Sequence, residues 1–123
     1  MARHSRQQAR DRLSALGDAP AAGTTAAHRL EKDASLLGRL LASAAGGQEP
    51  AVTADDVAAA LGLFEEMREQ LDRLETQVVI EARRHDMDWR QIARHQGLNS
   101  SQAASQRYQR LMTRLEEIRQ GVR

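Results

Sequence analysis

The sequence predicts an all-α protein, a helical hairpin with a long central helix that leads into a C-terminal helix-turn-helix. Ala, Leu, Arg, Glu and Gln dominate the 123 residues, and there is one Trp, one Tyr and one Phe. Such a composition favours helices over strands. Apolar residues recur at spacings of three and four, and capping residues and glycines interrupt that pattern where helices are expected to begin and end.

Composition also excludes several classes of protein. The length allows one domain with one modest core. No cysteine is present, which excludes disulfides and thiolate metal ligands or nucleophiles. No apolar run approaches membrane-spanning length, and the N-terminus lacks the apolar core of a signal peptide, so we expect a cytoplasmic protein without a membrane partner.

Neither the histidines nor the glycines indicate an active site. The four histidines are scattered without HxxxH or HExxH spacing. One turn could bring together His85, Asp86, Asp88 and His95, which we interpret as solvated helix ends rather than metal ligands. The pair Gly46-Gly47 lacks the lysine that follows a phosphate-binding loop. We therefore predict no enzymatic activity, no cofactor, no metal and no small-molecule substrate.

Residues 1–22 form a basic segment that starts with several arginines and ends in Gly, Asp and Pro. A helix is predicted around residues 7–16. The favoured interpretation is a flexible, solvated arm. The alternative is an arm that reaches DNA, as homeodomain arms do.

Residues 23–52 are predicted to form a packing helix followed by a Gly/Pro linker. Either Thr24 or Thr25 can cap the helix, which should end at Gly46 and Gly47. Its expected buried stripe is Leu30, Ala34, Leu37, Leu41 and Ala44.

Residues 53–86 predict a long acidic amphipathic helix. Thr53 and Asp56 have the spacing of a capping box, and Gly62 is the obvious place for a break. If unbroken to Arg84, the helix would be roughly 48 Å long. Its apolar seam is expected to consist of Val57, Phe64, Met67, Leu71, Leu74 and Val78, with Ala60 between them. Because one shorter helix cannot cover so long a seam, we favour a homodimer over a closed monomer.

Residues 87–123 carry the pattern of a helix-turn-helix with an extended recognition helix. Asp88 and Gln91 form a capping-box variant, and Gly97 can end the first short helix. The second helix begins either at an Asn99 cap paired with Gln102 or at a Ser100 cap alone. Its buried stripe should be Ala104, Tyr108, Leu111, Leu115 and Ile118, which extends the helix to about Arg119.

The opposite face of this second helix suggests contact with double-stranded DNA. Glutamine offers a donor and an acceptor to adenine, and arginine contacts guanine or phosphate. The expected base-reading residues are Gln102, Ser105, Gln106 and Gln109. The expected phosphate contacts are Arg90, Arg94, Ser101, Arg107, Arg110 and Arg114. The alternative is the solvated polar face of an ordinary bundle helix.

Charge is distributed in a way that fits this face. Residues 53–81 hold eight acidic residues against two arginines, whereas residues 82–123 hold nine arginines against four acidic residues. The overall charge of +1 therefore conceals an acidic middle and a basic C-terminal third. A basic surface that coincides with a recognition helix is expected of a phosphate binder.

The segment between Val57 and Leu111 resembles small actinomycete helix-turn-helix proteins that regulate a small heat-shock protein. The matching residues are Trp89, Ile92, Ala93, Gly97, Leu98, Gln102, Ala103, Ala104, Arg107 and Tyr108. The resemblance implies a DNA-binding regulator. Two departures concern the register of docking: Gln96 replaces an apolar residue before the glycine, and the turn is one residue longer than the commonest form.

The sequence thus predicts a sequence-specific DNA-binding protein, either a transcriptional regulator or a nucleoid-associated protein, which acts as a homodimer in the cytoplasm at the nucleoid. Two-fold symmetry predicts half-sites about 34 Å apart. One alternative is a helical coiled-coil scaffold or adaptor that binds a protein partner. Another is a DNA-packaging small subunit of a ring oligomer.

Overall fold

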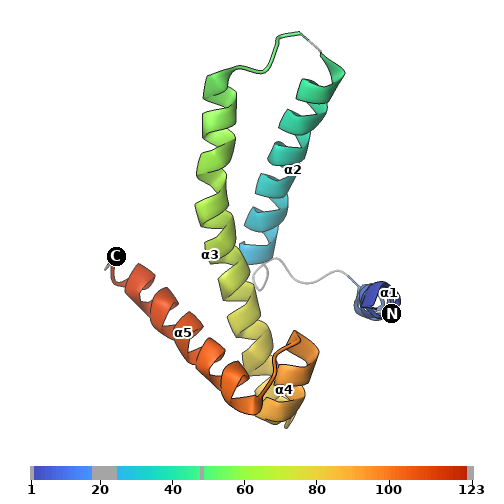
Figure 1. Ribbon diagram of the computed structural model, residues 1–123, viewed down its shortest axis with the longest axis vertical. Helices are drawn as coiled ribbons and strands as arrows, with labels where there is room; N and C mark the ends of the chain where they lie inside the picture. The colour runs from blue at the N-terminus through green and yellow to red at the C-terminus, as the bar shows by residue number, and fades with distance from the viewer. Residues whose placement is uncertain (1, 18–24, 48, 122–123) are drawn as a thin grey trace.

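The computed structural model describes residues 2–17, 25–47 and 49–121, and within them every regular element is a helix. The helices are α1 (Ala2–Ser14), α2 (Thr25–Gly46), α3 (Ala54–Arg84), α4 (Trp89–Gln96) and α5 (Ser101–Arg119). In Figure 1, α2 and α3 form an antiparallel hairpin, and α4 and α5 gather at the far end of α3. The predicted all-α class, with a helical hairpin leading into a C-terminal helix-turn-helix, is confirmed.

Helix α3 runs without interruption for 31 residues, which corresponds to about 46 Å. The predicted capping box is present: the Asp56 backbone N–H donates to Thr53 Oγ1 at 3.2 Å, and the Thr53 N–H donates to Asp56 Oδ2 at 2.9 Å. Gly62 does not break the helix. A glycine in a helix costs about 1 kcal/mol, which the good helix formers around it and the contact with α2 offset.

The buried face of α2 differs from the predicted stripe. Leu30 and Leu37 are half-buried as expected, but Ala34, Leu41 and Ala44 are exposed. Leu40 and Ser43 are half-buried in their place. Helical spacing allows either set, and the side that faces α3 decides which one is covered. Of the two possible caps, Thr24 lies outside the described residues, and α2 begins at Thr25.

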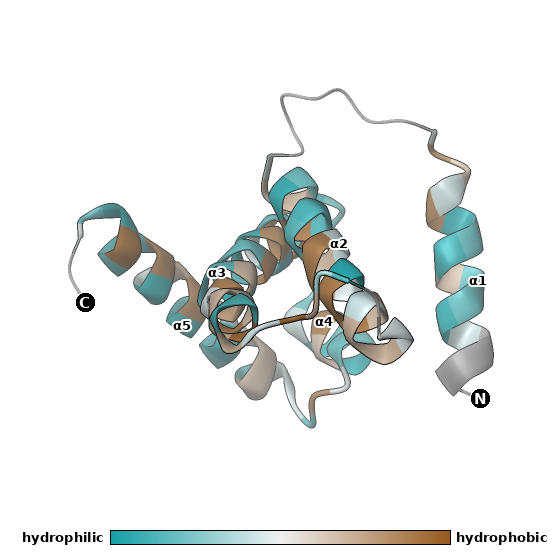
Figure 2. Ribbon diagram, turned by 90° about the horizontal axis from the view of Figure 1, so that it is seen from above, coloured by the Kyte–Doolittle hydropathy of each residue, from teal (hydrophilic) through white to brown (hydrophobic). Residues whose placement is uncertain are grey.

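Helix α1 begins earlier than predicted and ends two residues sooner. It spans Ala2–Ser14 rather than residues 7–16, and all its described side chains, together with those up to Gly17, are exposed. In Figure 2 it is mostly hydrophilic and stands apart from the other four helices. Residues 18–22 of the predicted flexible arm lie outside the described residues, so contact between this segment and DNA stays a prediction.

The core of the described residues lies where α3, α4 and α5 meet. Val79 on α3, Ile92 and Ala93 on α4 and Ala104 on α5 form one buried cluster. Leu111 is buried further along α5. Partly buried neighbours surround the cluster: Ala82, Met87, Trp89, Leu98 and Tyr108. The end of α3 therefore serves as the first helix of a three-helix head. We use the name head for this unit of the α3 end, α4 and α5.

Two glycines provide opposite tests of this architecture. Gly97 has φ of 74°, and Gly62 lies within α3; an added Cβ would meet no atom within 4 Å at either position. We expect Gly97→Ala to lower the free energy of unfolding by about 1 kcal/mol because an L-residue is strained at positive φ. Gly62→Ala should raise the free energy of unfolding, by somewhat less than about 1 kcal/mol. Urea unfolding followed by circular dichroism measures both changes. If the two substitutions changed the free energy of unfolding in the same direction, the prediction would be wrong.

Candidate nucleic-acid interface

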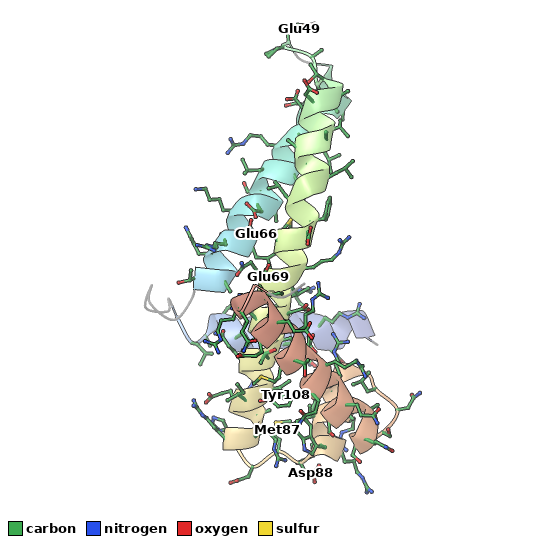
Figure 3. All side chains as sticks on the ribbon, turned by 90° about the vertical axis from the view of Figure 1, so that its left-hand side faces the viewer. Glu49, Glu66, Glu69, Met87, Asp88 and Tyr108 are labelled. Atoms are coloured by element: carbon green, nitrogen blue, oxygen red, sulfur yellow. The ribbon has the colours of Figure 1, made fainter. Side chains whose placement is uncertain are left out.

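The turn between α3 and α4 sets the direction of the first short helix. Asp86 takes a left-handed conformation with φ of 62°, and the Arg83 guanidinium donates to the Met87 carbonyl at 3.1 Å. Asp88 then caps α4 as predicted: its Oδ1 accepts from the Gln91 N–H at 2.8 Å, and its own N–H donates to Gln91 Oε1 at 2.8 Å. Figure 3 shows Met87 and Asp88 at the foot of the molecule, below Tyr108 of α5.

The turn between α4 and α5 follows the predicted punctuation. Gly97 ends α4 in the left-handed conformation, and the Leu98 N–H donates to the Ala93 carbonyl at 2.8 Å. Ser100 caps α5, where its Oγ accepts from the Ala103 N–H at 3.0 Å. Of the two starts that the sequence left open, the structure therefore selects the Ser100 cap alone.

Small and aromatic side chains hold α5 against the rest of the head. Ala104 is 1% exposed, so the α5 backbone approaches its neighbours closely at this position. The rings of Trp89 and Tyr108 lie 5.6 Å apart between centroids, tilted by 43°. The Arg83 guanidinium lies 5.0 Å from the centre of the Trp89 ring. These contacts use the inner face of α5 and leave its opposite face toward solvent.

The outer face of α5 carries most of the predicted base-reading residues in exposed positions. Gln102, Gln106 and Gln109 are exposed, whereas Ser105 is half-buried. Arg110, beside Gln106 on the helix surface, is also exposed. Within the described part of the chain, no ion pair engages Arg110. The face therefore offers amide groups in a row, with an unpaired guanidinium next to them.

Three of the predicted phosphate contacts meet at the start of α5. Arg90 and Arg94 of α4 and Ser101 of α5 line one shallow hollow, which Ala93, Leu98, Asn99 and Ser100 complete. The first N–H groups of a helix carry a partial positive charge. Neither arginine forms an ion pair with any described residue. Two arginines and the N-terminus of α5 thus border one hollow, and this combination of charges can hold a phosphate group.

The other two predicted phosphate arginines are engaged within the protein. Arg107 Nε and Nη2 donate to the two carboxylate oxygens of Glu75 at 2.5 and 2.7 Å. The hydrogen bond with Glu75 raises the pKa of Arg107 above its ordinary value, and burial opposes that rise. Arg114 lies 3.8 Å from Asp72. Both arginines therefore tie α5 to the acidic side of α3, and their contact with phosphate stays a prediction.

Gln96 joins this polar cluster. Its Nε2 donates to Glu75 Oε2 at 3.1 Å, while its Oε1 is buried and accepts no hydrogen bond from any described residue. The sequence marks Gln96 as a polar residue in a position that is usually apolar, but it does not reveal Glu75. The contact spans 21 residues, so the only available signal was an unusual glutamine opposite an acidic helix.

The predicted seam residues of α3 differ in how far they are buried. Val57, Phe64, Leu71 and Val78 are exposed, whereas Met67 and Leu74 are half-buried. Leu61, which the prediction missed, is 66% exposed. One apolar stripe along α3 thus has no cover within the described residues.

Comparison with protein families relates the head to DNA binding. A family model described as a Myb-like DNA-binding domain matches residues 80–117, the end of α3 with α4 and nearly all of α5. The match supports a DNA-binding protein. It also points to a non-enzymatic one. No curated protein and no solved structure matches the chain. None of the described helices is long and apolar enough to cross a membrane.

Proposed function

We propose that the protein is a sequence-specific DNA-binding regulator that inserts α5 into the major groove. The observation that carries the proposal is the outer face of α5, where three exposed glutamines lie in a row beside Arg110. The match of the same helices to a Myb-like DNA-binding domain supports it. Helices of this kind read bases from their exposed face while neighbouring elements contact the backbone.

The proposed contacts divide into two groups. Gln102, Gln106 and Gln109 read base edges, with Ser105 at the margin because it is half-buried. Arg90, Arg94 and Ser101 hold one phosphate at the start of α5, and Arg110 contacts the backbone beside the glutamines. Phosphate contacts position the head, whereas the amides supply the sequence preference.

We propose that the regulator acts as a homodimer at the nucleoid. Much apolar surface remains uncovered, including the stripe on α3. Two heads also bind a two-fold symmetric site more tightly than one small head does. We also propose, from its resemblance to small actinomycete helix-turn-helix proteins that regulate a small heat-shock protein, that the protein is a regulator of that kind.

Substitutions on α5 test the proposal. We expect Gln106→Ala to reduce the preference for the selected site over random duplex by about tenfold, since a good base contact is worth 1 to 3 kcal/mol. Arg110→Ala should weaken binding to both duplexes and reduce the dependence on salt by about one charge per head. Selection of sites from a random pool, followed by mobility shifts at several salt concentrations, measures both effects.

Arg39→Ala is the matched control because it removes the same charge from an exposed position on α2. It should leave the salt dependence nearly unchanged. The proposal fails if no duplex is enriched, or if Gln106→Ala and Arg39→Ala behave alike on selected and random DNA.

A further inference from the structure

The apolar residues on the uncovered side of α3 are spaced by the same intervals whether they are counted from the N-terminal or from the C-terminal end of the helix. They are Val57, Leu61, Phe64, Leu71, Leu74 and Val78, and we call them the α3 stripe. The intervals between successive members are four, three, seven, three and four residues. All members are exposed except Leu74, which is half-buried. Such a stripe is complementary to a second copy of itself placed in the opposite direction.

We propose that two copies pair through the α3 stripe with their α3 helices antiparallel. The inference rests on the homodimer proposed above and specifies its geometry. In this register, Val57 lies opposite the partner's Val78, and Phe64 lies opposite the partner's Leu71. Leu61 then meets the partner's Leu74. Each side chain fills a position between apolar residues of the other helix, as in a coiled coil.

Charge distinguishes this orientation from a parallel one. Asp55 and Asp56 occupy the first turn of α3, and Arg83 and Arg84 occupy its last turn. Antiparallel pairing brings acids near arginines at both ends and also opposes the two helix dipoles favourably. Parallel pairing would place acids beside acids and arginines beside arginines. Arg68, near the centre, lies close to its counterpart in either orientation and favours neither.

A groove beside the head extends the α3 stripe. Its volume is about 730 Å³. Leu71, Leu74 and Val78 belong to both surfaces. The groove continues from them past Ala82 to Met87 and Leu98. In the antiparallel pair, the N-terminal end of the partner's α3 lies along this groove. A parallel pair would set two such grooves against each other and leave both unfilled.

The orientation also sets the distance between the two heads. Val57 and Val78 are 21 positions apart on one straight helix, which corresponds to about 32 Å. Because each Val57 lies beside the partner's Val78, the head-bearing ends of the two α3 helices are separated by that distance. Two-fold helix-turn-helix proteins bind half-sites one DNA turn apart, about 34 to 36 Å. The length of the α3 stripe therefore matches the spacing of adjacent major grooves.

Cysteine cross-linking of the full chain tests the orientation, since the native sequence has no cysteine. The double variant Val57→Cys with Val78→Cys should form a covalent dimer under mild oxidation. Neither single variant should do so, because a disulfide needs Cα atoms within about 7 Å. Leu41→Cys, at an exposed position on α2, controls for disulfides that form by random collision between molecules. Rapid cross-linking of Val57→Cys alone would establish the parallel arrangement and overturn the inference.

If no disulfide forms, the distance between spin labels distinguishes the antiparallel from the parallel dimer. A nitroxide on Val57→Cys should lie about 32 Å from its counterpart in the antiparallel dimer, and less than half as far in a parallel one. Light scattering on the native protein separates the two proposals. A monomer at all concentrations would end the homodimer proposal and the inference with it. A dimer with the short spin-label distance would end the inference alone.

Discussion

Replacing Ile92 with alanine should lower the free energy of unfolding of the head by about 3 kcal/mol, the typical cost of truncating a large buried aliphatic residue. Ile92 is 3% exposed and contacts the cluster that joins α3, α4 and α5. Only five hydrophobic side chains of the described residues are buried, and Ile92 is one of them. With so few members, the cluster cannot close around the cavity, and we expect specific DNA binding to be lost at physiological temperature.

Leu41→Ala is the matched control for Ile92→Ala. It removes the same number of carbon atoms, but Leu41 is 67% exposed on α2. Its effect on unfolding should stay within about 0.5 kcal/mol. Thermal and urea unfolding by circular dichroism, with mobility shifts on the same samples, measure the two variants. If both lost equal stability, the head would not depend on the cluster at Ile92.

Local signals explain why the helix ends could be predicted. A cap requires only a side chain that accepts a hydrogen bond and a backbone N–H two or three positions away. The pairs that begin α3 and α4 have this spacing, and both capping boxes are present. Gly97 similarly marks a left-handed residue that glycine adopts at low cost. The short helices of the head are therefore encoded within four residues of each boundary.

Contacts between helices were harder to predict because periodicity does not identify the neighbour of each face. On α2, Leu40 and Leu41 fit a helical stripe equally well, and only the position of α3 covers the former. On α3, spacings of three and four grouped Met67 with Phe64. The structure separates them into a half-buried and an exposed residue. Which apolar residues of such a helix are buried therefore depends on where the neighbouring helix lies, and the spacing of the residues does not specify this.

The ion pair between Glu75 and Arg107 is the clearest case of a feature beyond sequence reasoning. The two residues are separated by 32 positions, and each has an unremarkable role on its own helix. On α3, Glu75 belongs to an acidic series that normally faces solvent. On α5, Arg107 was assigned to DNA phosphate. Their pairing depends on the angle at which α5 crosses α3, which no local pattern specifies.

Reversing the charge at Glu75 should therefore have a second large effect. Glu75→Arg would place two guanidinium groups together in a site where the native carboxylate is only 23% exposed. Gln96 would also lose its hydrogen-bond acceptor. Breaking a buried ion pair costs 3 to 5 kcal/mol. Because the Arg107 side chain is 42% exposed, solvent screening reduces our expectation to about 2 kcal/mol of unfolding free energy.

The swapped double variant, Glu75→Arg with Arg107→Glu, distinguishes the ion pair from mere crowding. Opposite charges then face each other again, so most of the stability lost in Glu75→Arg should return, while Glu75→Gln loses less than Glu75→Arg. Urea unfolding of the three variants and the native protein measures the coupling. The swap should restore the fold without restoring full DNA affinity, because a carboxylate on α5 repels phosphate. If the double variant were no more stable than Glu75→Arg, the ion pair would not be what holds α5 at its angle to α3, and that angle would depend on the cluster around Ile92 and on the contact between Arg114 and Asp72.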